Sequence, residues 1–355
     1  MTSGIGNAQL PRPTFLFIGA SKSGSSWFFQ ILREHPQVFV PANKATFFFS
    51  DYFAKGMAWY EAFFVKASPQ GAIGEVCHDY LASPEALRRI RAYQPDIRLV
   101  CCLRNPYARA LSSWRFFRRN GMDQPTLTAQ GEHDPSVFDQ GYYATQLSDL
   151  FSVFPKDQVL IFFFEELSAA PKAVAHRLYE FIGVKPDFLP ESLYKRINVN
   201  AQPRSRLLAR LVQNIHKESW KHSHYLSNLI GQLKQIRSLR HFVRAALYKE
   251  AESSSDWRQH LGEFPEEILL RYESEIGRLE SLLGKDLSQW RAVPADSADS
   301  TRVLSPSSDP PGQAEKGPVP NDSANLPDQR MGGLLSPAGT DSPAKSFGAT
   351  LTTLD

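Results

Sequence analysis

The first residues that could do chemistry lie in the stretch GASKSGSSW, residues 19–27, which follows an apolar run and precedes a helical pattern. Unpaired backbone N–H groups at a helix N-terminus favour an anion, and a glycine lets the backbone approach it closely. Within it, residues 22–26 supply one ammonium group, three hydroxyls and a glycine: Lys22, Ser23, Ser25, Ser26 and Gly24. It therefore predicts an anion-binding loop; the alternative is a capped helix after an ordinary turn.

The order of residues in this loop disfavours an ATP or GTP site. The Walker A motif places its lysine after the second glycine, whereas Lys22 precedes Gly24. A P-loop nucleotide kinase is therefore the weaker alternative, since it would also need an acidic magnesium ligand.

A second anion-binding element is predicted at RNPYARALSSWRFF, residues 104–117. Arg104 stands just past the apolar run IRLVCCL, and Ser112 follows about two turns into the next helical pattern. An arginine there can hold a phosphate through two parallel hydrogen bonds. The alternative is simple helix-start chemistry, with Pro106 at the first helical position.

The elements that must position these loops are apolar runs alternating with helical patterns. The runs lie at residues 14–20, 72–81, 97–103 and 158–164. This alternation predicts a three-layer, P-loop-like α/β fold with a central parallel sheet and helices on both faces. Ligands bind beyond the carboxyl ends of such strands, where both loops begin.

Four segments are expected along the chain. Residues 1–12 form a flexible N-terminus, 13–291 a single domain, and 292–355 a disordered tail rich in Pro, Ser, Gly and Asp. Within the domain, 203–249 is a basic helical insertion in which Glu218 is the only acidic residue. It could be a groove for an anionic acceptor, a surface resting on anionic lipid, or a solvated helical face.

Composition excludes several classes of function. The 355 residues are 42% hydrophobic and 22% charged, with a net charge of +3, as in an ordinary globular protein. The three cysteines form neither a disulfide framework nor a metal-ligand spacing, which suits a reducing compartment. The same spacing leads us to expect no bound metal. Without a signal-peptide pattern or a membrane-length apolar run, we expect a cytoplasmic protein. No nucleic-acid motif is present, and nothing indicates an oligomeric state.

The two loops resemble those of the sulfotransferases that use 3′-phosphoadenosine 5′-phosphosulfate (PAPS). SKSGSSW is similar to their 5′-phosphosulfate loop, usually PKSGTTW, and LRNPYARALSSW to their 3′-phosphate motif. The similarity extends over about residues 13–291 and is greatest to the bacterial and heparan-sulfate-like branch. It implies a transferase (EC 2.8.2.-) that moves a sulfuryl group to a hydroxyl or amine of a carbohydrate, glycolipid or small metabolite, releasing adenosine 3′,5′-bisphosphate (PAP).

The resemblance assigns roles to the loop residues. Residues 22–26 would wrap the 5′ end of PAPS, with Lys22 stabilising the bridging oxygen as the S–O bond breaks. Arg104 and Ser112 would hold the 3′-phosphate, and Arg204 would lie in a loop that closes over the nucleotide. Trp27 matches a tryptophan that stacks on adenine; the alternative is a core residue.

The chain departs from the family pattern at the general base. The family's KETHFF segment carries a glutamate that falls here on Ala45, or on Lys44 if the register slips by one. The first substitute is His78, whose intrinsic pKa suits a base; its alternative is a structural role. The second is Glu75, which matches a family GE motif where its role could be structural. Val76 occupies the place of a second family lysine. A degenerate protein that binds the nucleotide with little transfer is therefore an alternative.

Overall fold

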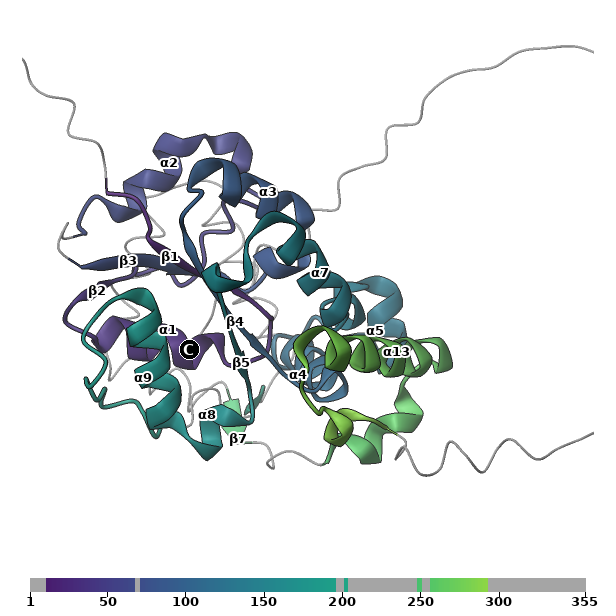
Figure 1. The fold of residues 1–355 in the computed structure, drawn as a ribbon. Helices are drawn as coiled ribbons and strands as arrows, with labels where there is room; N and C mark the ends of the chain where they lie inside the picture. Colours follow the sequence, from purple (N-terminus) through teal and green to yellow (C-terminus); the bar gives the residue numbers. More distant parts are fainter. Residues whose placement is uncertain (1–10, 68–70, 196–200, 204–247, 251–255, 293–355) are drawn as a thin grey trace, which may run out of the picture. The chain divides into compact units, whose positions relative to one another are not determined.

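A five-stranded parallel sheet forms the centre of the computed structural model, which describes residues 11–67, 71–195, 201–203, 248–250 and 256–292. The strand order is β2-β3-β1-β4-β5 (Figure 1). The strands are β1 (Phe15–Gly19), β2 (Val38–Phe39), β3 (Ala72–Val76), β4 (Arg98–Leu103) and β5 (Val159–Phe163). The predicted parallel sheet is confirmed.

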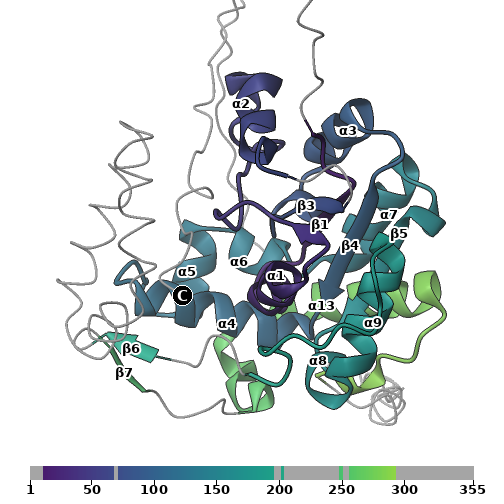
Figure 2. The same cartoon turned by 90° about the vertical axis from the view of Figure 1, so that its left-hand side faces the viewer.

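Helices cover both faces of the sheet (Figures 1 and 2). Along β1, Phe15 and Phe17 pack with one helical layer, whereas Leu16 and Ile18 pack with the other, because successive side chains point to opposite faces. The first layer contains α1 (Ser25–Glu34) and α9 (Pro171–Ile182); the second contains α3 (Pro84–Tyr93), α7 (Tyr143–Val153) and α13 (Glu266–Leu283). The three-layer α/β fold is therefore confirmed.

The remaining elements connect these layers. The α-helices are α2 (Met57–Glu61), α4 (Pro106–Arg119), α5 (Leu127–His133), α6 (Ser136–Asp139) and α8 (Glu166–Ala169). The 3₁₀ turns are η1 (Phe53–Lys55), η2 (Ala62–Phe64), η3 (Tyr80–Ala82), η4 (Lys156–Gln158), η5 (Trp257–Glu263) and η6 (Ser288–Trp290). A separate antiparallel pair consists of β6 (Ala201–Pro203) and β7 (Tyr248–Glu250), and β6 lies beside α4.

Two observations bear on the expected segment boundaries, which stay predictions. Arg12, assigned to the flexible N-terminus, donates from Nε to Glu61 Oε1 at 3.0 Å. The ends of the segment 203–249 are extended strands in β6 and β7 instead of helix, because they pair with one another. Residues 204–247 and 293–355 lie outside the described part of the chain.

Two further properties concern only the described residues. None of their helices combines the length and apolar character needed to cross a membrane. Cys77, Cys101 and Cys102 are buried free thiols.

Candidate nucleotide and acceptor site

The loop between β1 and α1 has the backbone geometry of an anion cradle. Gly24 is the N-cap of α1 with a φ of 94°, and Lys22 also has a positive φ, 64°. For a lysine this conformation costs on the order of 1–3 kcal/mol, and such strain clusters at functional sites. No side chain caps α1, and its first turn carries no acidic residue. The helix N-terminus therefore retains its preference for an anion.

The hydroxyls of this loop differ in accessibility. Ser23 is fully buried, and its Oγ lies 3.4 Å from the carbonyl oxygen of Ser21. Ser25 is also buried, whereas Ser26 is half-buried. The Lys22 ammonium lies 4.1 Å from the centroid of the Phe116 ring on α4. Lys22 thus reaches across the end of the sheet toward the second predicted loop.

Arg104 joins the two loops, because β4 lies next to β1. Its Nη1 donates to the carbonyl oxygen of Lys22 at 3.1 Å, and its guanidinium lies 4.5 Å from the centroid of the Phe164 ring. Burial lowers the pKa of Arg104, although an arginine stays charged at neutral pH. Among the described residues, no carboxylate forms an ion pair with Arg104. Since a buried charge is costly without a partner, the position suits an anionic ligand.

Ser112 lies on α4, two turns after Arg104, and is half-buried. The structure shows no hydrogen bond between these two side chains. Their shared role in holding a phosphate stays a prediction.

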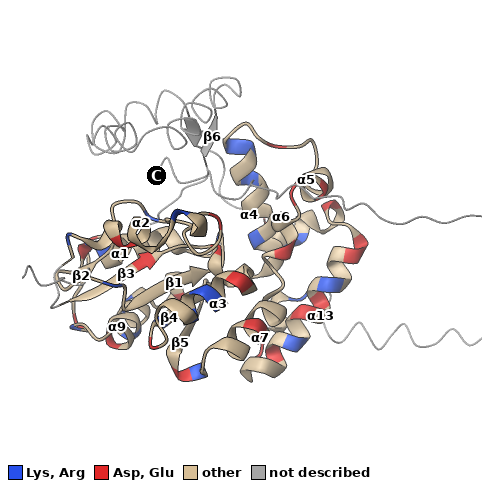
Figure 3. Cartoon of the chain, turned by 90° about the horizontal axis from the view of Figure 1, so that it is seen from above, with Lys and Arg blue, Asp and Glu red and all other residues tan. Residues whose placement is uncertain are grey.

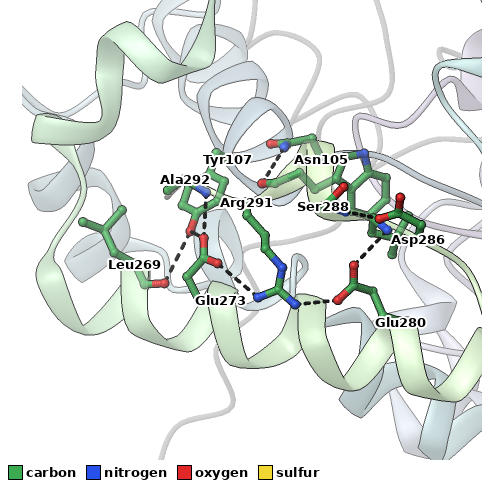
Figure 4. A network of polar contacts seen from close by, with 11 residues as sticks. Asn105, Tyr107, Leu269, Glu273, Glu280, Asp286, Ser288, Arg291 and Ala292 are labelled. Carbon is green, nitrogen blue, oxygen red and sulfur yellow. Dashed lines mark hydrogen bonds and ion pairs between the residues drawn. The ribbon is translucent and has the colours of Figure 1, made fainter. Parts of the chain in front are cut away.

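The start of α4 is fixed by contacts that the sequence did not reveal (Figure 4). Asn105 caps the helix by accepting from the Ala108 N–H at 3.0 Å, and its Nδ2 donates to the Trp290 carbonyl oxygen at 3.0 Å. The Tyr107 hydroxyl donates to Glu273 Oε1 on α13 at 2.8 Å. These bonds connect the start of α4, directly after Arg104, to residues more than 160 positions away in the sequence.

Arg291 closes this network at the end of the described domain (Figure 4). Its guanidinium pairs with Glu280 at 2.5 Å and with Glu273 at 3.5 Å, while the Ala292 N–H donates to Glu273 at 2.7 Å. The fold thus extends through Ala292.

Lys44 brings a second ammonium group to the first loop. It follows β2, its Nζ donates to Ser26 Oγ at 2.5 Å, and only 9% of the residue is exposed. Ala45 is instead buried in the core. Val76, at the place of the second family lysine, is also fully buried. The chain therefore supplies a second lysine here from a different strand.

Glu75, one of the two residues predicted to be catalytic, has a carboxyl group enclosed by hydrogen-bond donors. The residue is fully buried, and Oε1 accepts from the Thr46 N–H at 2.6 Å and from Thr46 Oγ1 at 2.7 Å. Oε2 accepts from the Tyr60 hydroxyl at 3.0 Å, and Tyr80 lies 3.3 Å from both oxygens. Burial raises the pKa of Glu75, and these hydrogen bonds oppose that rise. These contacts fit the structural role that the sequence left open for Glu75.

Replacing Glu75 with alanine should therefore lower stability. We expect a loss of about 3–5 kcal/mol in unfolding free energy, because the variant leaves buried donors unpaired and opens a cavity. Urea unfolding would measure it, with Glu85→Ala on the exposed face of α3 as the matched control. A Glu75→Gln variant of unchanged stability that lost all transfer activity would contradict the structural role.

His78 lies just beyond β3, with 20% of its side chain exposed. Burial, followed by the charges of Lys44 and Lys22, lowers the pKa of His78 to about 3, so the ring is neutral at physiological pH. Nε2 lies 3.5 Å from Asp79 Oδ1, whereas Nδ1 is buried without a hydrogen-bond partner among the described residues. The structure thus brings Lys44, His78 and Lys22 together from the ends of three adjacent strands.

Trp27 is a core residue. It is 7% exposed, its indole Nε1 donates to the Leu193 carbonyl oxygen at 3.0 Å, and its ring packs edge-on against Phe28. The structure therefore supports the core alternative over stacking on adenine. Arg204, the remaining predicted nucleotide contact, lies outside the described residues.

A parallel sheet with the β1–α1 loop and Arg104 joined at its carboxyl edge is typical of P-loop-like, nucleotide-binding folds. Residues 12–263 match the sulfotransferase domain family, and the chain belongs to that family. The sequence-based assignment to the PAPS-dependent sulfotransferases is confirmed.

Individual relatives agree with this assignment. Human heparan sulfate glucosamine 3-O-sulfotransferase 6 is 28% identical over 193 residues, which cover 52% of this chain and 56% of the relative. A membrane-associated sulfotransferase of Dictyostelium discoideum is 31% identical over 128 residues, covering 34% and 27%. The chain thus spans about half or less of the length of these curated relatives. The crystal structure of a sulfotransferase from Alicyclobacillus acidocaldarius shares the fold, with a TM-score of 0.55 and 22% identity, covering 79% of this chain and 99% of that one.

Proposed function

We propose that this protein transfers a sulfuryl group from PAPS to a hydroxyl or amine of a carbohydrate, glycolipid or small metabolite. The observation that carries the proposal is the 3.1 Å hydrogen bond from Arg104 to the Lys22 carbonyl. It brings two cationic loops, 82 residues apart in sequence, to one edge of the sheet. One nucleotide with phosphate groups at both ends fits this pair of loops.

The residues present suit such a nucleotide. The uncapped N-terminus of α1, with Lys22 and Lys44, would hold the 5′-phosphosulfate, and Arg104 with Ser112 the 3′-phosphate. The described residues contain no group of His, Cys, Asp and Glu side chains that could hold a metal ion. The charge on the leaving group would be balanced by Lys22 and Lys44.

The proposed transfer is an in-line displacement at sulfur. A ring nitrogen of His78 accepts the proton of the acceptor, whose oxygen or nitrogen forms the new bond to sulfur. The bond between sulfur and the bridging oxygen breaks, and its electron pair stays on PAP. Lys22 stabilises the charge that develops on that oxygen, which favours the transition state over the ground state.

The acceptor belongs to the carbohydrate-like class if the chain follows its relatives, some of which are named for heparan sulfate glucosamine. The basic segment 203–249 of the sequence stays a candidate for contact with that acceptor, and β6, which contains its first residue, lies beside α4. In the alternative proposal, the basic segment binds anionic lipid at the cytoplasmic surface of a membrane. Sedimentation with vesicles containing anionic lipid, at low and high salt, would separate the two.

The proposal is tested by transfer of labelled sulfate from PAPS to a panel of sugars and phenols in the presence of EDTA. We expect transfer without magnesium, and a loss of about 10²–10⁴-fold in the His78→Ala variant, the usual contribution of a general base. Binding of PAP without any transfer would identify the degenerate alternative. Activity dependent on magnesium would instead favour a kinase.

Replacing Gly24 with alanine should weaken PAP binding. The added Cβ would lie 2.4 Å from Leu167 Cδ1, and a φ of 94° strains any residue with a side chain. We expect a decrease in affinity of about tenfold or more, because strain of 1–2 kcal/mol in the cradle opposes binding. Calorimetric titration measures it, with Gly262→Ala as control, where a Cβ meets nothing within 4 Å. Equal affinities for both variants would refute the cradle.

A further inference from the structure

The side chain of Asp79 lies beside His78 and is not needed to cap the 3₁₀ turn that it precedes. It is the N-cap of η3, but its side chain makes no capping hydrogen bond. Its Oδ1 lies 3.5 Å from His78 Nε2 and accepts from Gln140 Nε2 at 3.4 Å. The side chain is only 17% exposed. A largely buried carboxyl group is thus aimed at one nitrogen of the proposed base.

We propose that Asp79 positions His78 for proton transfer by holding a hydrogen on Nε2, which leaves the lone pair of Nδ1 to receive the acceptor's proton. This inference rests on the proposed function, in which His78 is the base. Asp79 is a positioning residue, since it acts through the imidazole without touching the acceptor.

The two ring nitrogens have different surroundings, and this difference carries the proposal. An ionised carboxylate can only accept hydrogen bonds, so it favours a hydrogen on the nitrogen that faces it. The opposite nitrogen, Nδ1, is buried and lacks a hydrogen-bond partner among the described residues. Such an atom is costly unless a ligand group pairs with it. An acceptor hydroxyl that donates to Nδ1 would satisfy it.

The 3.5 Å separation is longer than an established hydrogen bond. Contacts of this kind are often long in a free enzyme and tighten when the substrates bind. The ring of Phe47 packs edge-on against His78, with centroids 5.5 Å apart. This contact restricts the imidazole in the free enzyme.

The surrounding charges make His78 a better base once the nucleotide is bound. Lys44 and Lys22 lower the pKa of His78 in the free protein. Anionic groups held by these two lysines would offset their charges, so the pKa of His78 would rise. The Asp79 carboxylate would stabilise the imidazolium that forms, as a buried aspartate does for other catalytic histidines.

Asp79 itself titrates near neutrality. Burial, followed by the charge of Asp51, raises its pKa to about 7; Asp134 adds to the rise, and the Gln140 hydrogen bond opposes it. A raised pKa means that the carboxyl is protonated below about pH 7 and ionised above it. The Nε2–H tautomer should therefore predominate at pH 8 and decline toward pH 6.

The direct test is the tautomer of His78 in the full chain labelled with ¹⁵N-histidine. Long-range ¹H–¹⁵N spectra distinguish a protonated from an unprotonated ring nitrogen, and the His78→Ala variant identifies the signal. At pH 8 we expect Nε2 to be protonated, and we expect Asp79→Asn to reduce that population while Asp51→Asn leaves it unchanged. Protonation of Nδ1 in the wild-type protein at pH 8 would overturn the proposal without any variant.

Kinetics provide the second test. Asp79→Asn should lower kcat about 10²-fold or more while PAP affinity stays within twofold, and it should remove the rise in kcat through pH 7. In the His78→Ala background the same change should have little further effect, because Asp79 acts through the imidazole. Additive losses would contradict the positioning role. Absence of both PAP binding and transfer would instead refute the proposed function and leave the tautomer result standing.

Discussion

Replacing Arg104 with alanine is expected to weaken PAP binding about 30- to 1,000-fold, which corresponds to roughly 2–4 kcal/mol. The guanidinium is half-buried at the end of β4 and has no carboxylate partner among the described residues, so the 3′-phosphate would be its counter-charge. Titration calorimetry measures the change. Arg88→Ala, which removes an exposed arginine of α3, serves as the control.

The ligand provides a further control for Arg104. Adenosine 5′-phosphate lacks the 3′-phosphate, so its affinity should be nearly the same for wild type and Arg104→Ala. Arg104→Lys should recover part of the PAP affinity through charge, but not the paired hydrogen bonds of a guanidinium. An equal loss of affinity for both nucleotides would show that Arg104 supports the fold of the loop, through its bond to Lys22, and does not recognise the phosphate.

Replacing Lys22 with methionine is expected to lower the transfer rate about 10²–10³-fold, since removing one donor from a developing oxyanion costs about 2.7–4 kcal/mol. The affinity for PAP should fall much less, because Lys22 acts mainly on charge that appears as the S–O bond breaks. Single-turnover transfer of labelled sulfate would separate the rate from binding. Lys156→Met is the matched control, since Lys156 also packs on an aromatic ring, Phe151, but precedes β5 at the opposite edge of the sheet.

Lys44→Met gives the same experiment a second arm. If Lys44 shares the task of Lys22 through its contact with Ser26, its loss should lower the rate by a smaller factor. A Lys22→Met variant that transfers sulfate at the wild-type rate, with Lys44→Met severely impaired, would reassign the leaving-group contact to Lys44.

The parallel sheet and its two anion loops could be predicted because they depend on local patterns. Apolar runs predict β1 and β4. The lysine, arginine, serine and glycine residues within a few positions after them predict anion binding. The buried face of α1, including Phe28, Ile31 and Leu32, follows from helical spacing in the same way. Such features need no knowledge of which strands are neighbours.

The rest of the site depends on contacts between distant segments. Lys44 reaches Ser26 only because β3 and β1 bring the end of β2 to this edge. Glu75 matched a motif, but only the structure shows Thr46 and Tyr60 enclosing its carboxylate. Asp79 adjoins His78 in sequence, yet adjacency does not reveal which ring nitrogen it faces.

Titration of the unaltered full chain with PAP, in EDTA, tests the central claim most directly. If two cationic loops hold opposite ends of one nucleotide, PAP should bind with one site per chain and at least tenfold more tightly than adenosine 5′-phosphate. No heat with PAP from folded protein, or equal affinity for the two nucleotides, would contradict the account.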